Sequence, residues 1–171
     1  MALTQQLARV TPQYLARCRA AAEASPDGDP DWDPPVEDTV DLDWAIWGLI
    51  WFCQRMHVEG PCVQVLERSI SGDPGGDAEF LDHPGVHDGF DSPPALLAPA
   101  VVAELARELA ALDVDDILRC LPADHVEAAE ACGFRGFSGH PREYLVEHFG
   151  LLQSFYVVAG RRGLAALTWT D

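Results

Sequence analysis

The sequence predicts an α+β fold, a single helix-rich domain with a small sheet of short strands that includes both termini. Long segments carry apolar side chains at helical spacing, and β-prone segments lie at both ends of the chain. The predicted helices and strands do not alternate regularly, as they would in a doubly wound sheet. A chain of 171 residues can build one stable core, so residues 1–171 are expected to form a single domain.

The first half of the chain is expected to hold one strand and three helices. Residues 2–10 are predicted to form the strand, although the polar Thr4, Gln5 and Gln6 weaken the pattern. Thr11-Pro12 begins a helix that ends near residue 25, because threonine caps helices and proline fits the first helical position. Further helices are expected over 41–56, capped by Asp41, and over 62–70, where a strand is the alternative.

The second half is expected to hold a minimal strand, four helices and a closing strand. The strand is predicted at 95–97, and the first helix runs from Pro99 to about residue 112. Asp113 is predicted to cap a second helix, and a third is expected from Pro122 to Gly133. The last helix is predicted to begin at Pro141 and to end at Gly160. The β-prone segment 163–171 is predicted to form the closing strand.

Two long segments are predicted to lack regular structure. The segment 26–40 is rich in proline and aspartate, and the window 23–43 holds nine acids and no base. It is interpreted either as an acidic docking loop anchored by Trp32 or as a connector whose Trp32 folds back on the core. The segment 71–94 is an irregular loop of a length that is usually functional or disordered.

The charge of the chain limits its partners. It has 28 acidic and 11 basic residues, all of the latter arginine, and its formal net charge is −17. A chain without a basic face cannot release counterions from phosphates, so nucleic acid and anionic membrane surfaces are not expected partners. A basic protein partner would be favoured electrostatically.

No segment is predicted to span a membrane, and the start of the chain lacks the apolar region of a signal peptide, so a cytoplasmic location is expected.

One loop could hold a metal ion. Two imidazoles and several carboxylates occur within ten residues, and such side chains bind divalent metals. Pro84-Gly85 prevents the helix that would place the two histidines on one face, so a solvated polar loop is the alternative. The candidate ligands are Asp82, His83, His87 and Asp88, with Asp91 nearby.

No cofactor is predicted. The glycines at 72, 75 and 76 lack a following lysine, and the neighbouring Asp73 and Asp77 would repel a phosphate. The five cysteines follow no metal-ligand spacing and are expected to be reduced and mostly buried. No serine has an identifiable base, so no catalytic residue is assigned.

The aromatic side chains give a second candidate site. Trp44, Trp47 and Trp51 recur at helical spacing and share one stripe of the predicted helix. If this stripe is not wholly covered, it could form an aromatic pocket or a homodimer seam with Tyr156, Phe155 and Trp169; the alternative is one well-packed core.

The order of several segments resembles that of the YfbM-like family, a bacterial domain of unknown function. The likeness is carried by the segments LTQQLARVTPQYL, DLDWAIWGLIWF, LERSISGD, GFDSPPALLAPAVVAELARELAAL and YLVEHFGLLQSFYVVAGRRGLAALTW. It implies a compact α+β domain that is able to dimerise, and it carries over no catalytic residue. The acidic Pro-Asp insert before the tryptophan helix departs from the family pattern.

These observations leave three hypotheses for the function. The first is a non-enzymatic binding or regulatory module, of a toxin-neutralising type for example, that engages a basic protein through its acidic surface. The second is a metal-dependent enzyme that uses the His/Asp loop at 82–91. The third is a small-molecule binder with a tryptophan-lined pocket.

Overall fold

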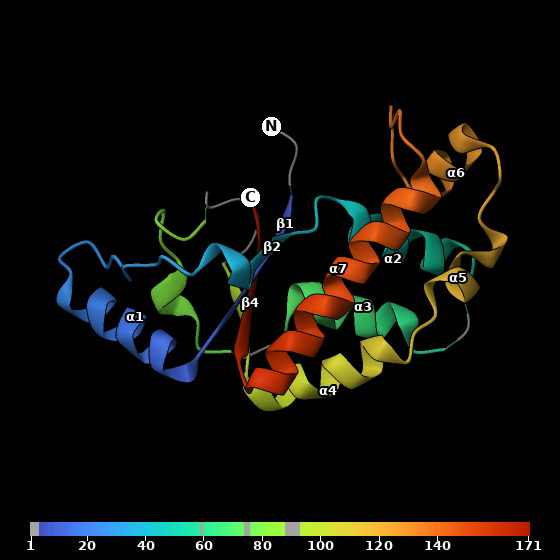
Figure 1. Cartoon of the computed structure of the whole chain (residues 1–171). Helices are drawn as coiled ribbons and strands as arrows, with labels where there is room; N and C mark the ends of the chain where they lie inside the picture. Colours follow the sequence, from blue (N-terminus) through green and yellow to red (C-terminus); the bar gives the residue numbers. More distant parts are fainter. Residues whose placement is uncertain (1–3, 59, 74–75, 88–92) are drawn as a thin grey trace.

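The two ends of the chain meet in the middle of one antiparallel sheet (Figure 1). The structure is a computed structural model that describes residues 4–58, 60–73, 76–87 and 93–171. Its strand order is β2-β1-β4-β3, and β1 pairs with β4 from Gln5 opposite Thr170 to Val10 opposite Ala165. The strands are β1 (Gln5–Val10), β2 (Thr39–Asp41), β3 (Ala95–Leu97) and β4 (Ala165–Thr170).

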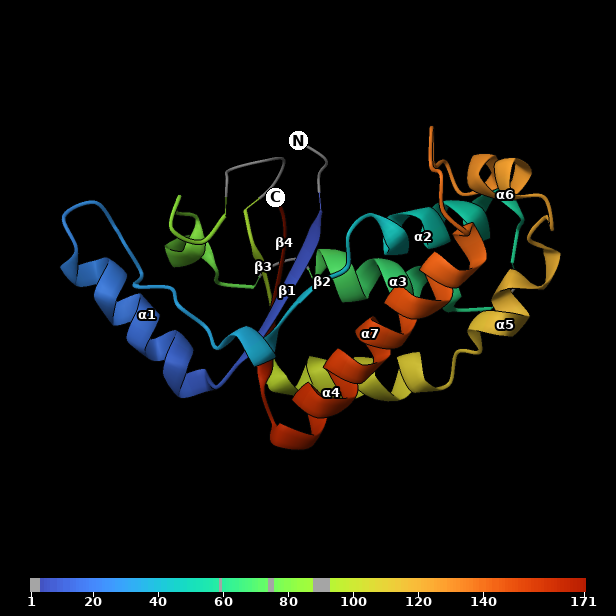
Figure 2. The same ribbon diagram turned by 45° about the horizontal axis from the view of Figure 1, so that its top comes forward.

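Helices cover both faces of this sheet (Figure 2). On one face α1 packs with a 3₁₀ turn at Glu79–Leu81, and the larger helical layer lies on the other face. The helices are α1 (Pro12–Ala24), α2 (Ala45–Arg55), α3 (Cys62–Ser71), α4 (Pro99–Ala110), α5 (Val114–Ile117), α6 (His125–Ala131) and α7 (Pro141–Arg162). No helix in the described ranges is long and apolar enough to cross a bilayer.

Successive residues of the strands face two different hydrophobic cores, one on each side of the sheet. Leu7 of β1 and Ala166 of β4 belong to the main core under the helical layer, whereas Ala8 and Leu167 belong to the smaller core under α1. Successive side chains of a strand point to opposite faces, so a sheet covered on both sides needs apolar residues at consecutive positions. This explains why β4 is buried over nearly its whole length.

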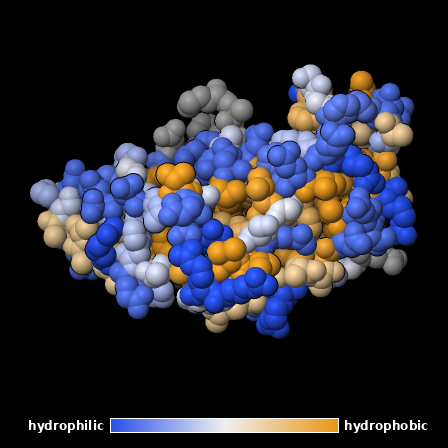
Figure 3. All heavy atoms as spheres, viewed as in Figure 1, coloured by the Kyte–Doolittle hydropathy of each residue, from blue (hydrophilic) through white to orange (hydrophobic). Residues whose placement is uncertain are grey.

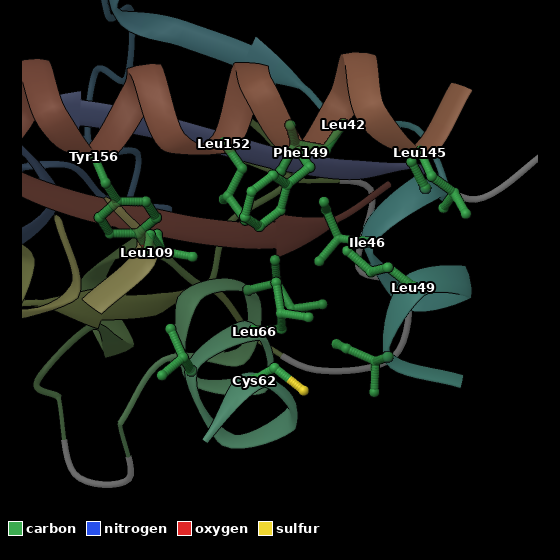
Figure 4. Packing of buried hydrophobic residues seen from close by; sticks show 14 of the residues in the cluster. Leu42, Ile46, Leu49, Cys62, Leu66, Leu109, Leu145, Phe149, Leu152 and Tyr156 are labelled. Carbon is green, nitrogen blue, oxygen red and sulfur yellow. The ribbon is translucent and has the colours of Figure 1, made fainter. Parts of the chain in front are cut away.

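The longest helix, α7, organises the main core (Figure 4). Its inward side chains point toward residues of α2, α3 and α4, and each fully buried Leu or Phe contributes about 1.5–3 kcal/mol to the burial of apolar surface. The labelled side chains are Leu145, Phe149, Leu152 and Tyr156 from α7, Ile46 and Leu49 from α2, Cys62 and Leu66 from α3, Leu109 from α4, and Leu42, which follows β2.

The predicted α+β fold, with both ends of the chain in a small sheet, is confirmed. Two of the predicted helix caps, Thr11 and Asp113, are confirmed as well. The Thr11 side chain accepts a hydrogen bond from the Tyr14 N–H, and the Asp113 side chain accepts from the N–H groups of Asp115 and Asp116. Residues 62–71 form the predicted helix and not the alternative strand.

Asp41 does not cap the tryptophan helix. Residues 39–41 form β2 at the edge of the sheet, where Asp41 lies opposite Gln6, and α2 begins only at Ala45. The Asp41 carboxylate accepts a hydrogen bond from the Asp43 N–H, and Asp43 has a positive φ of 49° that turns the chain into the helix. The loop predicted at 26–40 therefore ends in a 3₁₀ turn, Val36–Asp38, and in β2.

Two helix bounds also differ from the prediction. The third helix of the second half begins at His125 and not at Pro122, because the Asp124 side chain accepts from the N–H groups of Val126 and Glu127. α7 continues through Gly160 and ends at Arg162, and the residue that caps it, Gly163, has a left-handed φ of 65°. A Cβ at Gly160 would lie 3.3 Å from the Ala106 Cβ, so this glycine allows α7 and α4 to pack closely.

A buried carboxylate ties the sheet to the end of α7. Asp38 is 7% exposed, and its carboxylate accepts hydrogen bonds from Arg9 Nε at 2.8 Å and from an Arg162 guanidinium nitrogen at 2.6 Å. Burial alone would raise the pKa of Asp38, but the hydrogen bonds from Arg162 and Arg9 outweigh it and lower the pKa below its ordinary value. Arg9 also lies 5.4 Å over the Phe155 ring, so the network joins β1, the 3₁₀ turn and α7.

We expect Asp38→Asn to lower the free energy of unfolding by about 3 kcal/mol, because it leaves two guanidinium groups without their shared anion. Since the folded pKa of Asp38 is depressed, its contribution is present above the ordinary carboxyl range and is lost as the pH falls toward the lowered pKa. Urea unfolding between pH 7 and pH 3 measures both effects. Asp116→Asn, at an exposed ion pair with Arg119, is the control. Equal stability of the two variants at pH 7 would contradict the prediction.

Candidate functional site: a tryptophan-lined hollow

The tryptophan stripe of α2 is only partly covered. Trp44 is 39% exposed and Trp51 is 54% exposed, while Trp47 is half-buried between them. The opposite side of the helix is buried against α7, α3 and α6, through Ala45, Ile46, Leu49, Ile50, Phe52 and Cys53. The helix is therefore an interior element on one side and an exposed aromatic surface on the other.

The three indoles line one hollow, which we call the tryptophan hollow. Its volume is about 300 Å³, and it is completed by Cys132, Gly133 and Arg135 at the end of α6. Trp44 and Trp47 are stacked, with ring centroids 5.7 Å apart and planes 26° apart. The Trp51 indole lies beside Gly133. The hollow is at the small end of the range for ligand pockets, and stacked aromatic walls suit a flat or cationic group.

Close packing beneath the hollow depends on Gly48. A Cβ at this position would lie 2.1 Å from the Phe134 ring, so only glycine lets that ring approach the helix. Phe134 in turn contacts Phe137 and Tyr144, with ring centroids 5.5 Å away in both cases. The chain that follows α6 is thereby held against α2 and supplies one wall of the hollow.

Tyr144 fixes the Trp44 end of the hollow. Its hydroxyl oxygen accepts a hydrogen bond from the Trp44 backbone N–H at 3.2 Å. Burial and a hydrogen bond to Asp43 raise the pKa of the Tyr144 phenol, so it stays protonated and donates to that carboxylate. The start of α2 is held in place, and a carboxylate lies at this end of the hollow.

Trp47 is tied to the sheet through Gln5. The Trp47 indole N–H donates to Gln5 Oε1 at 3.0 Å, and the Gln5 side chain is buried. Gln5 Nε2 donates to Thr168 Oγ1 at 2.6 Å and to the Trp169 carbonyl at 2.9 Å. The middle indole therefore has one orientation, set by β1 and β4.

Tyr156 does not join the tryptophans. It is fully buried in the main core, where its hydroxyl donates to the Ser69 carbonyl at 2.6 Å and burial raises its pKa. The structure brings together Trp44, Trp47 and Trp51 and leaves Tyr156 in the interior. Trp169 lies in the other core, beneath α1.

Trp32 folds back on the protein, as the connector interpretation expects. Its ring lies 5.5 Å from Tyr14 and 6.4 Å from Trp169, edge-on to both. The Asp33 N–H donates to the Tyr14 hydroxyl at 2.8 Å, which holds the acidic segment against α1. The indole is partly buried in the smaller core.

The His/Asp loop has a local network of its own. His87 is buried, and its Nε2 lies 3.1 Å from Asp82 Oδ1. His83 Nδ1 accepts a hydrogen bond from the Gly85 N–H. Asp88 and Asp91 lie outside the described residues. Among the residues that are described, no three His, Cys, Asp or Glu side chains are grouped around one point. The metal site of Asp82, His83, His87 and Asp88 stays a prediction.

Some groupings have no signal in the sequence. His125 and His140, 15 residues apart, are in contact through their rings. The expectation that the cysteines are mostly buried is confirmed, because only Cys120 of the five is exposed. Burial raises the pKa of Cys132 to about 12, so the thiol in the wall of the tryptophan hollow is protonated at neutral pH and is a poor nucleophile.

Comparison with known proteins identifies the fold. No protein-family model and no curated protein match the chain. A solved structure does match, the crystal structure of a protein of unknown function, YfbM from Escherichia coli, with a TM-score of 0.58. The fold is YfbM-like. The alignment covers 96% of this chain and 98% of YfbM at 17% identity, so it supports the resemblance read from the sequence and carries no residue role.

Two glycine variants test the close packing beneath the hollow. We expect Gly48→Ala to destabilise the protein by about 1–3 kcal/mol, because the methyl group displaces Phe134 from a packed cluster. Gly150→Ala in α7 meets no atom within 4 Å and should stabilise by up to about 1 kcal/mol, from helix propensity alone. Urea denaturation followed by circular dichroism gives both values. Stabilisation of similar size in both variants would show that Phe134 does not pack on Gly48.

Proposed function

We propose that the chain is a non-enzymatic binding module that engages a basic protein segment through its acidic surface, with the tryptophan hollow as the point of contact. The observation that carries the proposal is the pair of exposed indoles, Trp44 and Trp51, on either side of a hollow in a chain of net charge −17. Aromatic side chains are the usual anchors of protein interfaces.

The lining of the hollow suits binding better than catalysis. The described residues that line it are three indoles, a protonated buried thiol, a glycine and one arginine, with no histidine or carboxylate among them. The Asp43 carboxylate beyond the Trp44 end is held by the Tyr144 hydroxyl. The exposed indole faces can stack with the guanidinium or ammonium group of a partner, and tryptophan is the strongest cation–π acceptor among the side chains.

The charge of the surface favours the same partner. Hydrophilic residues surround the hydrophobic ones on the face shown in Figure 3. Acidic residues outnumber arginines by 28 to 11, and Asp43 lies at the Trp44 end of the hollow. Such a charge excess accelerates encounter with a basic segment and weakens with added salt.

A small planar ligand is the second candidate occupant. It is favoured by the volume of about 300 Å³ and by the stacked Trp44 and Trp47, which form a flat apolar wall. A second copy of the chain is a third possible occupant, and the experiment below separates the three.

The test is a titration of the protein with a peptide rich in lysine and arginine, followed by calorimetry and tryptophan fluorescence. We expect saturable binding that weakens as salt rises. Trp51→Ala should weaken it by at least about fivefold, or ~1 kcal/mol, through loss of a cation–π contact. Leu151→Ala, at an exposed apolar residue of α7, is the matched control and should bind like the unchanged protein.

Three outcomes would overturn the proposal. The first is no binding of the basic peptide at low salt, and the second is unchanged binding by Trp51→Ala. The third is a dimer in light scattering that Trp51→Ala dissociates, because a second copy would then occupy the hollow. Saturable binding of a neutral indole or naphthalene probe, with no binding of the peptide, would favour the small-ligand alternative.

A further inference from the structure

Two histidines face each other where α6 and α7 begin. His125 Nε2 lies 3.2 Å from His140 Nδ1, and the ring centroids are 4.3 Å apart with the planes at 78°. His125 is the first residue of α6, and His140 directly precedes α7. Both side chains are exposed, so solvent and solutes reach the paired nitrogens.

The pair lines a hollow of about 330 Å³ beside the first turn of α7. Glu143, in the first turn of α7, also lines it. Arg142 is held elsewhere, because its guanidinium donates to Asp115 Oδ1 and to the Leu118 carbonyl. The hollow therefore offers two imidazole nitrogens as metal ligands, with the negative charge of Glu143 in its lining, while its arginine is already paired.

We propose that His125 and His140 bind one divalent transition-metal ion of the zinc class. Two imidazole nitrogens that each lie ~2.0–2.1 Å from a tetrahedral zinc ion are about 3.3 Å apart, close to the observed spacing of this pair. Imidazole nitrogens suit zinc, nickel and copper and are poor ligands for calcium and magnesium. The site is separate from the His/Asp loop and from the tryptophan hollow.

When the metal binds, the ion replaces the hydrogen bond between the two imidazole rings. In the free protein one of the two facing nitrogens donates a hydrogen bond and the other accepts it, and the tautomer decides which one donates. When the ion binds to two neutral rings, both facing nitrogens present lone pairs, and the proton moves to the far nitrogen of the ring that carried it. The ion loses two waters, and this exchange releases no net proton.

Water completes the coordination sphere. The described part of the chain places no third His, Cys, Asp or Glu side chain at the same point, so the two histidines are the protein ligands. The amino-terminal ends of helices disfavour a cation, and this effect is opposed by Asp124, the N-cap of α6, and by Glu143 in the first turn of α7. We therefore expect a weak, reversible site that closes the segment 126–139 into a loop.

The test is calorimetric titration of the protein with zinc chloride and with nickel chloride. We expect one ion per chain and a rise in Tm with metal concentration, since the ion binds the folded state preferentially. His125→Gln and His140→Gln should each weaken binding by at least ~10-fold, the loss that follows even when a group behind a metal ligand is removed. Both histidines are exposed, so the variants should fold normally.

Two further variants locate the site. His57→Gln removes a histidine that lies after α2, and it is the control that should bind metal like the unchanged protein. His83→Gln removes a predicted ligand of the His/Asp loop, so it tests that loop as the competing site. The proposal is overturned if the unchanged protein binds neither metal, if His125→Gln and His140→Gln bind as well as it does, or if His83→Gln alone abolishes binding.

Discussion

The architecture depends on one buried amide, the side chain of Gln5. Its two nitrogen-bound hydrogens and its oxygen join β1 to Thr168 and the Trp169 carbonyl in β4 and to the Trp47 indole in α2. An unpaired amide in an apolar interior would cost a few kcal/mol, so these partners must assemble together. The sheet, formed from the two ends of the chain, and the tryptophan helix are therefore coupled, and the middle wall of the tryptophan hollow is fixed by the centre of the fold.

Side chains near Gln5 also form hydrogen bonds with the carbonyl groups at the end of α3. A helix leaves its last carbonyl oxygens without partners within the helix. Here the Tyr156 hydroxyl donates to the Ser69 carbonyl, and the Thr168 hydroxyl donates to the Ile70 carbonyl. α3 is thus docked end-on by side chains of α7 and β4. This role explains why Tyr156, which was a candidate to complete a pocket or seam with the tryptophans, is fully buried and away from the tryptophan hollow.

Features that depend only on neighbouring residues could be predicted from the sequence. Features that depend on contacts between distant segments could not. The caps at Thr11 and Asp113 and the helix after Pro99 need only neighbouring residues, and they were predictable. β2 is three residues long and exists because β1 offers it an edge, so nothing within the acidic segment indicates it. Gln5 weakened the strand prediction on polarity alone, although in the fold it is the residue that joins the sheet to α2. The His125–His140 pair likewise depends on how α6 and α7 meet. The sequence predicts that the three tryptophans share one stripe of a helix. It does not show which segments cover that stripe, so its exposure could not be predicted.

Trp47 is the fixed indole and Trp51 the exposed one, on the same helix and in the same hollow. Hydrogen exchange of the tryptophan indole N–H groups, resolved by NMR, measures this difference directly in the unaltered protein. We expect the Trp47 indole N–H, bonded to a buried amide, to exchange far more slowly than that of Trp51. Equal and rapid exchange at the two positions would show that Gln5 does not hold Trp47, and the link between the sheet and the tryptophan hollow would be lost.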